Sequence, residues 1–283
     1  MYGQTLRAIR QSKNYAQKDI CQNKFTQATY SNFEKSKSDL TASNLIHVLD
    51  TLNMTLEELR FIENGFNFNE SEQLSEQFFK LHLNAPEQIK PLLREMEAFL
   101  LENPKHQSIQ ELKLICEALI TLWDDEDITT ARKKVQRVWN RISKYDDFYL
   151  ADIRLMNAIL FVFEFDSAIH IFETLKKNLN KYKGFQNAES LMILLRINFS
   201  LICIKNKDYN RALAIIMTLQ NTHLAQLSFM QYAVCLNRYA ICLHNTNQPG
   251  AASCIEKRNT LLDLYNQLPL IEHFEREYNK YAL

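Results

Sequence analysis

The sequence predicts an all-α protein. Only four glycines and five prolines occur among 283 residues, whereas hydrophobic residues make up 46%. Sandwiches, barrels and Rossmann folds need many tight turns, and glycine and proline supply much of the backbone geometry that those turns require. Long helices with short connections need few such residues. Apolar residues also recur at helical spacing through most of the chain, which points to the same class.

Charge and polarity divide the chain into two parts. Residues 1–40 carry seven basic and three acidic side chains, which gives a net charge of +4. Residues 41–66 carry one basic and four acidic side chains, which gives a net charge of −3. Such an asymmetry suits a module that touches phosphates on one side only, although chance can also produce a difference of this size. A polar run begins at Asn67. We therefore expect one domain at 1–66 and a second, larger domain at 67–283.

Helical periodicity predicts five short helices in the first part. They cover residues 4–12, 16–23 and 27–35, then a fourth helix that ends near Leu52 and a fifth that begins after Thr55. Thr26 is the expected N-cap of the third helix, Thr41 or Ser43 that of the fourth, and Thr55 forms a capping box with Glu58. The expected core consists of Leu6, Ile9, Ile20, Cys21, Tyr30, Phe33, Leu45, Val48, Leu49 and Leu52.

The third helix has an apolar face and an exposed polar face. Tyr30 and Phe33 lie three residues apart and face the core. The opposite face carries Gln27, Ala28, Thr29 and Asn32. Two short helices joined by a tight turn, the second with such a polar face, are typical of a helix-turn-helix, which places one helix in the major groove of DNA.

This part resembles the Cro/C1-type helix-turn-helix of phage repressors over residues 3–62. The resemblance implies that Gln17 binds a backbone phosphate, and that Arg10 and Glu34 form a semi-buried salt bridge. The family often has glycine where Ser36 stands, so we expect a slightly different turn there. The resemblance implies DNA contact at Gln17, Thr26, Gln27, Ala28, Thr29, Asn32, Lys35 and Lys37. The side-chain amides would read adenine edges, and the lysines would bind phosphates. The alternative is a five-helix bundle that has lost DNA contact or uses this surface to bind protein.

The second part contains internal repeats. An asparagine within an apolar run is followed, eleven or fourteen residues later, by an alanine in another such run; the pairs are Asn157 and Ala168, Asn198 and Ala212, and Asn237 and Ala251. A fainter copy has Glu117 and Ala131, so successive copies begin 40, 41 and 39 residues apart. Each copy reads as an inner helix, a short turn and an outer helix. Stacked copies form an α-solenoid similar to tetratricopeptide (TPR) repeats.

The three repeated asparagines suggest a peptide-binding groove. Asparagine is a poor residue within a helix because its amide competes with the backbone. Asn157, Asn198 and Asn237 on a concave face would bond the main chain of an extended peptide, and Arg154, one turn before Asn157, would pair with a peptide carboxylate. The alternative for the amides is cross-linking of neighbouring helices. For Arg154 it is a surface salt bridge with Asp152 or Glu189.

Several classes of protein are not indicated. The six cysteines form no CxxC pair and most have apolar neighbours, so we expect free thiols in a reducing cytoplasm. There is no HExxH motif, no Ser/His/Asp order and no phosphate-binding loop, so we expect neither an enzyme nor a cofactor or metal. The longest apolar run, 158–163, is too short to cross a bilayer.

The two-part layout resembles the Rgg/GadR/MutR regulators, within the RRNPP group of peptide-sensing proteins of Gram-positive bacteria. The resemblance lies in the spacing of Gly3, Leu6 and Arg10, in the run 30–35 and in the run 45–55. It implies a cytoplasmic homodimer that binds an operator in double-stranded DNA and responds to a short peptide pheromone, as in quorum sensing. A ligand-independent dimeric repressor and a helical-repeat adaptor for other proteins stay open as alternatives.

Overall fold

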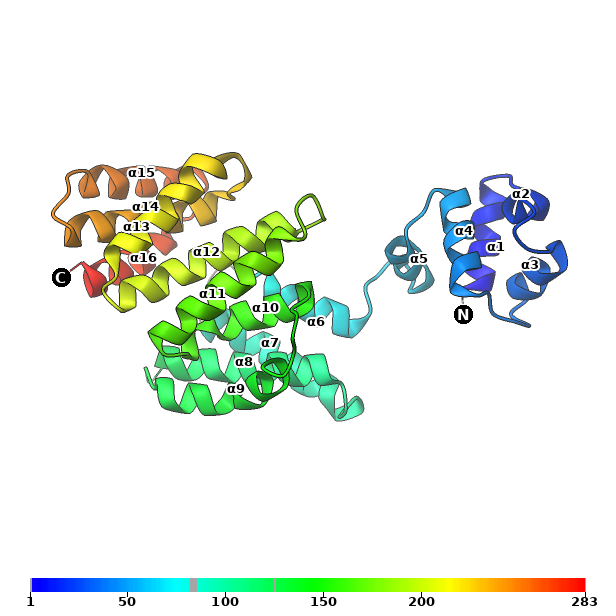
Figure 1. Ribbon diagram of the computed structural model, residues 1–283, viewed down its shortest axis with the longest axis horizontal. Coiled ribbons are helices and arrows are strands. Elements are labelled where there is room, and N and C mark those ends of the chain that lie inside the picture. The colour runs from blue at the N-terminus through cyan, green and yellow to red at the C-terminus, as the bar shows by residue number, and fades with distance from the viewer. Residues whose placement is uncertain (1, 82–85, 125, 283) are drawn as a thin grey trace. The chain divides into compact units, whose positions relative to one another are not determined.

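The computed structural model describes residues 2–81, 86–124 and 126–282, and every regular element in these ranges is a helix (Figure 1). The all-α prediction is confirmed. The N-terminal helices are α1 (Gly3–Ser12), α2 (Gln17–Cys21), α3 (Gln27–Glu34), α4 (Ala42–Leu52), α5 (Leu56–Glu63) and α6 (Glu70–Phe79). The others are α7 (Pro86–Glu102), α8 (Gln107–Asp124), α9 (Ile128–Ile142), α10 (Leu150–Ile159), η1 (Leu160–Val162), α11 (Phe165–Asn180), α12 (Ala188–Lys205), α13 (Tyr209–Thr222), η2 (Leu224–Gln226), α14 (Phe229–Asn245), α15 (Ala251–Leu264) and α16 (Pro269–Tyr281).

The chain forms two compact units. The N-terminal unit comprises residues 1–80 and 101–103, and the repeat unit comprises residues 81–100 and 104–283. Helix α6, which follows the boundary expected at residue 66, groups with the N-terminal unit. The domain limits 1–66 and 67–283 stay a prediction. Within the described residues, no helix is both long and apolar enough to span a membrane.

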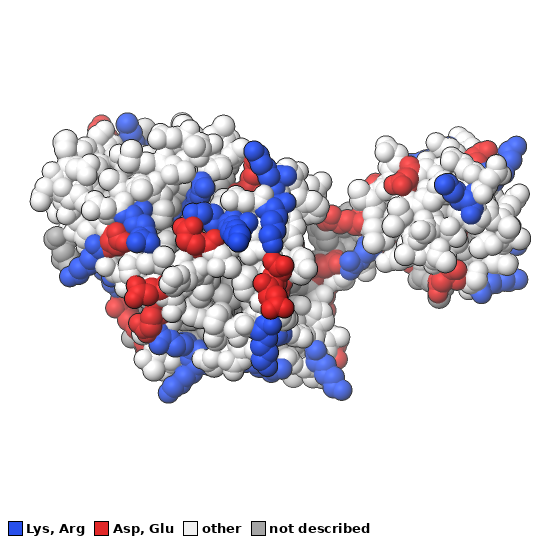
Figure 2. Space-filling model, in the orientation of Figure 1, with Lys and Arg blue, Asp and Glu red and all other residues white. Residues whose placement is uncertain are grey.

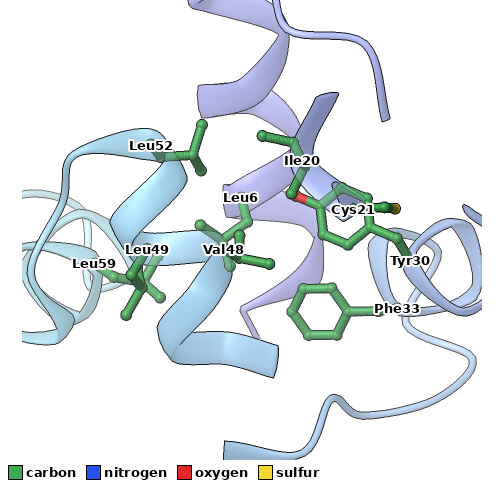
Figure 3. Close-up of a cluster of buried hydrophobic side chains, with 9 residues drawn as sticks. All are labelled: Leu6, Ile20, Cys21, Tyr30, Phe33, Val48, Leu49, Leu52 and Leu59. Atoms are coloured by element: carbon green, nitrogen blue, oxygen red, sulfur yellow. The ribbon is translucent and has the colours of Figure 1, made fainter. Parts of the chain in front are cut away.

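The N-terminal unit is built around one apolar cluster (Figure 3). Its buried members are Leu6, Ile20, Cys21, Tyr30, Phe33, Val48, Leu49, Leu52 and Leu59. Each large apolar side chain removed from water contributes about 1.5–3 kcal/mol, so this cluster is the main source of stability in the unit. The expected N-caps are also present: the Thr26 hydroxyl accepts from the N–H of Thr29 at 3.1 Å, and the Thr55 hydroxyl accepts from the N–H of Glu58 at 3.0 Å.

Helices α1 and α3 approach each other closely at Gly3. A Cβ atom there would lie 2.0 Å from the carbonyl oxygen of Phe33, so only glycine fits without a backbone shift. The turn after α3 keeps the form that a glycine would give it, because Ser36 itself adopts the left-handed conformation with φ of 57° and donates its N–H to Phe33 O. A non-glycine residue in this conformation costs about 1–2 kcal/mol.

A buried ion pair joins the same two helices. Arg10 Nε lies 2.6 Å from Glu34 Oε1 and Arg10 Nη2 lies 3.0 Å from Glu34 Oε2, and both residues are buried. The hydrogen bonds to Glu34 raise the pKa of the Arg10 guanidinium, although burial opposes this effect. Arg10 Nη1 also donates to the carbonyl of Tyr15 at 2.7 Å. The expected salt bridge is confirmed, with the two-bond geometry that favours arginine over lysine.

The repeat unit consists of stacked helix pairs. Helix α8 packs on α9, α10 on α11, α12 on α13 and α14 on α15, and α16 packs on α14 and α15 at the end of the array. The alanines that mark the second helix of each copy, Ala131, Ala168 and Ala212, are fully buried, whereas Ala251 in the last pair is half-buried. An alanine at this contact lets the two helices of a pair lie close together, as the repeat pattern predicted.

We expect removal of one partner of the Arg10–Glu34 pair to destabilise the N-terminal unit strongly. Glu34→Ala should lower the free energy of unfolding of the N-terminal unit by about 3–5 kcal/mol, because it leaves a buried guanidinium without its carboxylate. Replacing both, with Arg10→Met and Glu34→Leu, should cost far less. Both tryptophans, Trp123 and Trp139, lie in the repeat unit, so tryptophan fluorescence reports that unit while circular dichroism reports both. An unchanged dichroism transition in Glu34→Ala would contradict the expectation.

Candidate functional site

Helix α3 presents the expected polar face to solvent. Gln27, Ala28 and Asn32 are exposed, and Thr29 is half-buried, with its hydroxyl 2.8 Å from that of Thr26. Tyr30 and Phe33 on the opposite face belong to the core. The structure therefore places the four expected base-facing residues on one continuous surface.

A chain of hydrogen bonds connects this surface to the buried ion pair. Glu34 Oε2 accepts from Gln17 Nε2 at 2.7 Å, and Gln17 Oε1 accepts from Gln27 Nε2 at 3.3 Å. One carboxylate thus orients an amide at the start of α2, and that amide contacts the first residue of α3. The spacing of these residues contains no signal for this link, because it depends on how α2 and α3 cross.

The cations around α3 are not equivalent. Lys35 and Lys37 directly follow the helix and are exposed, as expected for phosphate contacts. Lys13, by contrast, donates from Nζ to the carbonyl of Leu52 at 2.5 Å, so its ammonium is held against the end of α4. Figure 2 shows lysine and arginine side chains on this unit with aspartate and glutamate between them.

The repeated asparagines do not share one environment. Asn198 on α12 is exposed, and its Nδ2 donates to Asn157 Oδ1 on α10 at 3.2 Å; Asn157 itself is buried. Asn237 on α14 is fully buried. The three amides therefore do not all face open space, as a common groove would require: Asn157 is buried, and Asn237 is covered by α15 and α16, where it accepts from Arg258 Nη1 and donates to Glu277 Oε1 at 3.4 Å.

The other members of the expected groove also have neighbours within the chain. Arg154 on α10 is half-buried and interacts with other residues of the protein. Glu117, at the corresponding position of the faintest repeat, forms ion pairs with Lys113 at 3.7 Å and with Lys134 at 3.8 Å. In every copy of the repeat, the side chain at this position is polar and forms a hydrogen bond or an ion pair with another side chain.

Two buried arginines near Asn237 were not identified from the sequence. Arg238 donates to Ile197 O at 2.6 Å and to Glu277 at 3.2 Å, and so ties α14 to α12 and α16. Arg258 is fully buried, and its guanidinium lies 5.7 Å from the centre of the Phe274 ring. Burial lowers the pKa of Arg258. Arginine is mostly a surface residue, so nothing in the pattern marks these two as internal.

Solved structures with the same fold cover the whole length of the chain. One is a candidate transcriptional regulator from Listeria monocytogenes EGD-e, with 19% identity, 98% of each chain covered and a TM-score of 0.71. Another is the SHP pheromone receptor Rgg2 of Streptococcus dysgalactiae, with 17% identity, 99% of each chain covered and a TM-score of 0.68. PlcR of Bacillus thuringiensis, in complex with the peptide PapR7 and DNA, has 14% identity and a TM-score of 0.72, with 96% of this chain and 98% of PlcR covered.

A comparison with curated protein sequences found no match. The family model for the C-terminal domain of the HTH-type transcriptional regulator Rgg matches residues 100–278, which include α8 to α15 and most of α16. This match covers more than half of the chain and lies almost entirely in the repeat unit, and the solved structures match the N-terminal helices as well. The protein therefore belongs to the family of the HTH-type transcriptional regulator Rgg.

Proposed function

We propose that this protein is a sequence-specific DNA-binding transcriptional regulator controlled by a short peptide that binds the concave side of the repeat unit. The observation that carries the proposal is the α3 surface, on which Gln27 is held by Gln17 and through it by the buried Glu34. PlcR, which has the same fold, was solved with a peptide and DNA bound, and Rgg2 is a pheromone receptor. We propose no enzyme activity for this protein.

The α3 surface fits the major groove of DNA. An amide presents a donor and an acceptor side by side, which matches the edge of adenine, so Gln27 and Asn32 are the candidates for base reading. Ala28 and the methyl group of Thr29 suit contact with a thymine methyl. Thr26 and Gln17 lie at the N-termini of α3 and α2, where hydroxyl, amide and backbone N–H groups suit phosphates, and Lys35 and Lys37 add charge.

We expect substitutions on this surface to separate base reading from phosphate binding. Gln27→Ala and Asn32→Ala should each weaken operator binding by about 1–3 kcal/mol and relax the sequence preference. Gln17→Ala should weaken all sequences more evenly. Gln11→Ala, an exposed glutamine on α1, is the matched control. Mobility-shift titrations against operator and random DNA measure both effects, and unchanged preference in Gln27→Ala and Asn32→Ala would show that another surface reads the DNA.

The exposed amide of Asn198 suits a peptide main chain. In the described part of the structure, Asn198 makes one side-chain hydrogen bond, to Asn157. An asparagine amide has two N–H donors and an accepting oxygen, so one donor and the oxygen stay available to an extended backbone. Asn157 fixes the orientation of the neighbouring amide in advance, which lowers the entropy lost on binding. Arg154 lies one turn before Asn157 and is the candidate partner for a peptide carboxylate.

We expect Asn198 and Asn237 to respond differently to the same change. Asn198→Ala should reduce peptide affinity by about 0.5–1.5 kcal/mol with little loss of stability, whereas Asn237→Ala should cost about 1–3 kcal/mol of stability because it removes an acceptor from the buried Arg258. Synthetic peptides encoded by short reading frames beside the gene are the probes, and tryptophan fluorescence gives the melting temperature of the repeat unit. A stability loss in Asn198→Ala with unaltered peptide binding would contradict the peptide site.

We also expect a homodimer that uses the end of the repeat unit, since two-fold proteins match two-fold operators. Phe274 of α16 is buried against its own chain, so the candidate surface is the exposed apolar group Leu264, Tyr265 and Leu268. The full chain should scatter light as twice 33.3 kDa, and Leu264→Arg should shift it toward the monomer. Leu101→Arg, at another highly exposed leucine, is the control. A monomeric wild-type protein at micromolar concentration would refute the dimer.

A further inference from the structure

Helix α16 is anchored on the last helix pair by buried contacts. Phe274 is 1% exposed, and the carboxylate of Glu277 lies 3.2 Å from Arg238 Nε on α14. Asn245 Nδ2 also donates to the carbonyl of Tyr281, the last residue of α16, at 2.8 Å. Because a buried, hydrogen-bonded pair is costly to break, these contacts hold α16 on α14.

The same helix also contacts the other end of the repeat array. His273 stacks on Trp123 of α8, with ring centres 5.6 Å apart and ring planes 6° apart. Lys280 forms an ion pair with Glu126, which lies between α8 and α9 and is 154 residues away in the chain. Within the repeat unit, α8 packs on α9 and α9 on α10. The series continues because α10 packs on α12, α12 on α14 and α14 on α16. The contact between α16 and α8 therefore closes the series into a ring.

We call the four residues of this contact, Trp123, Glu126, His273 and Lys280, the clasp. Unlike the anchor on α14, the clasp is open to water: the Lys280 and Glu126 side chains are 48% and 72% exposed, and Trp123 is 41% exposed. The hydrogen bond from Lys280 lowers the pKa of the Glu126 carboxyl. Exposed ion pairs and single aromatic contacts each contribute little. The array is thus closed by exposed contacts, which can open while α16 stays attached to α14.

Lys205 lies within electrostatic reach of the clasp and on the same helix as the exposed Asn198. It lies seven residues after Asn198, about two turns along α12, and so on the same face of the helix. Its side chain is exposed, and yet burial lowers its pKa, with further lowering by Lys280 and Arg238 and opposing effects of Glu277 and Glu126. The charges of Lys280 and Glu126 act on Lys205, so the clasp lies near one end of the α12 face that carries Asn198.

We propose that the clasp controls entry to the concave side of the repeat unit, so that the array must open between α8 and α16 before a peptide reaches Asn198. The inference rests on the proposed function only in naming a peptide as the molecule that enters. In the closed ring, small solutes reach Asn198, whereas a peptide needs the opened state. The apparent affinity for a peptide is then reduced by the fraction of molecules that are open.

The test measures entry with a chemical probe, in the full chain. A thiol is placed at the exposed position by Asn198→Cys, and Cys254→Ser removes the one cysteine that is not buried. N-ethylmaleimide reports the reactivity of the thiol to a small reagent, and a short peptide carrying a maleimide reports entry of a peptide-sized molecule. The substitution Lys280→Glu places a second carboxylate opposite Glu126. It should increase the rate at which the maleimide peptide reacts with the thiol about two- to fivefold. The rate with N-ethylmaleimide should not change.

Three further variants make the result specific to the clasp. Combining Glu126→Lys with Lys280→Glu restores an ion pair of reversed polarity and should return the rate to that of the parent. His273→Ala removes the stack on Trp123 and leaves the charge next to Glu126 unchanged. Like Lys280→Glu, it should increase the rate of reaction with the peptide reagent. Lys257→Glu, an exposed lysine on α15, makes the same charge change elsewhere and should have no effect.

A second readout follows the clasp itself. With Trp139→Phe, Trp123 is the only tryptophan, and acrylamide should quench it more strongly in Lys280→Glu and in His273→Ala than in the parent. Equal quenching in all variants would overturn the clasp, and stronger quenching with an unchanged peptide-reagent rate would overturn its control of entry. Neither readout uses DNA or a natural peptide, so the clasp can fail while the proposed function stands, and the proposed function can fail while the clasp stands.

Discussion

Close packing of one helix pair against the next is the interaction on which the repeat unit depends. A pair such as α12 and α13 cannot cover its own apolar face, and α12 alone buries eleven residues against helices on several sides. The fully buried alanines Ala131, Ala168 and Ala212 allow the helices of a pair to lie close together. Stacking leaves one uncovered face at the end of the array, and α16 covers it with Phe274. The concave side exists because the inner helices follow one another in this stack.

Buried arginines fix how these helices are placed. Arg10 joins α1 to α3, Arg238 joins α14 to α12 and α16, and Arg258 joins α15 to Asn237 on α14. A planar guanidinium donates several bonds in fixed directions, so each of them sets the relative position of helices that apolar contacts alone would hold less specifically. In the N-terminal unit, the Arg10–Glu34 pair is linked through Gln17 to the exposed Gln27 of α3. Holding a recognition side chain in place before a ligand arrives limits the entropy lost on binding.

Regulation by a ligand needs two states that bind it with different affinity. The repeat unit supplies a physical basis for two states, because α16 is held by buried contacts on one side and by exposed contacts on the other. Opening the clasp breaks one exposed ion pair and one aromatic stack, while the buried contacts of α16 with α14 stay in place. A ligand with modest preference for one state can then shift the population.

Periodicity in the sequence determined the helices, the core of the N-terminal unit and the repeat order, because it reports which face of a local element is apolar. The Arg10–Glu34 pair followed from a family resemblance, and the structure has it. Tertiary structure alone decided the partners of the polar residues: Gln17 bonds Gln27, Asn157 bonds Asn198, and Asn237 lies buried beside Arg258. Asn237 differs from the exposed Asn198, which has the same repeat position, because α15 and α16 cover it. The partner of a polar side chain depends on how helices distant in sequence cross, and local spacing does not contain that information.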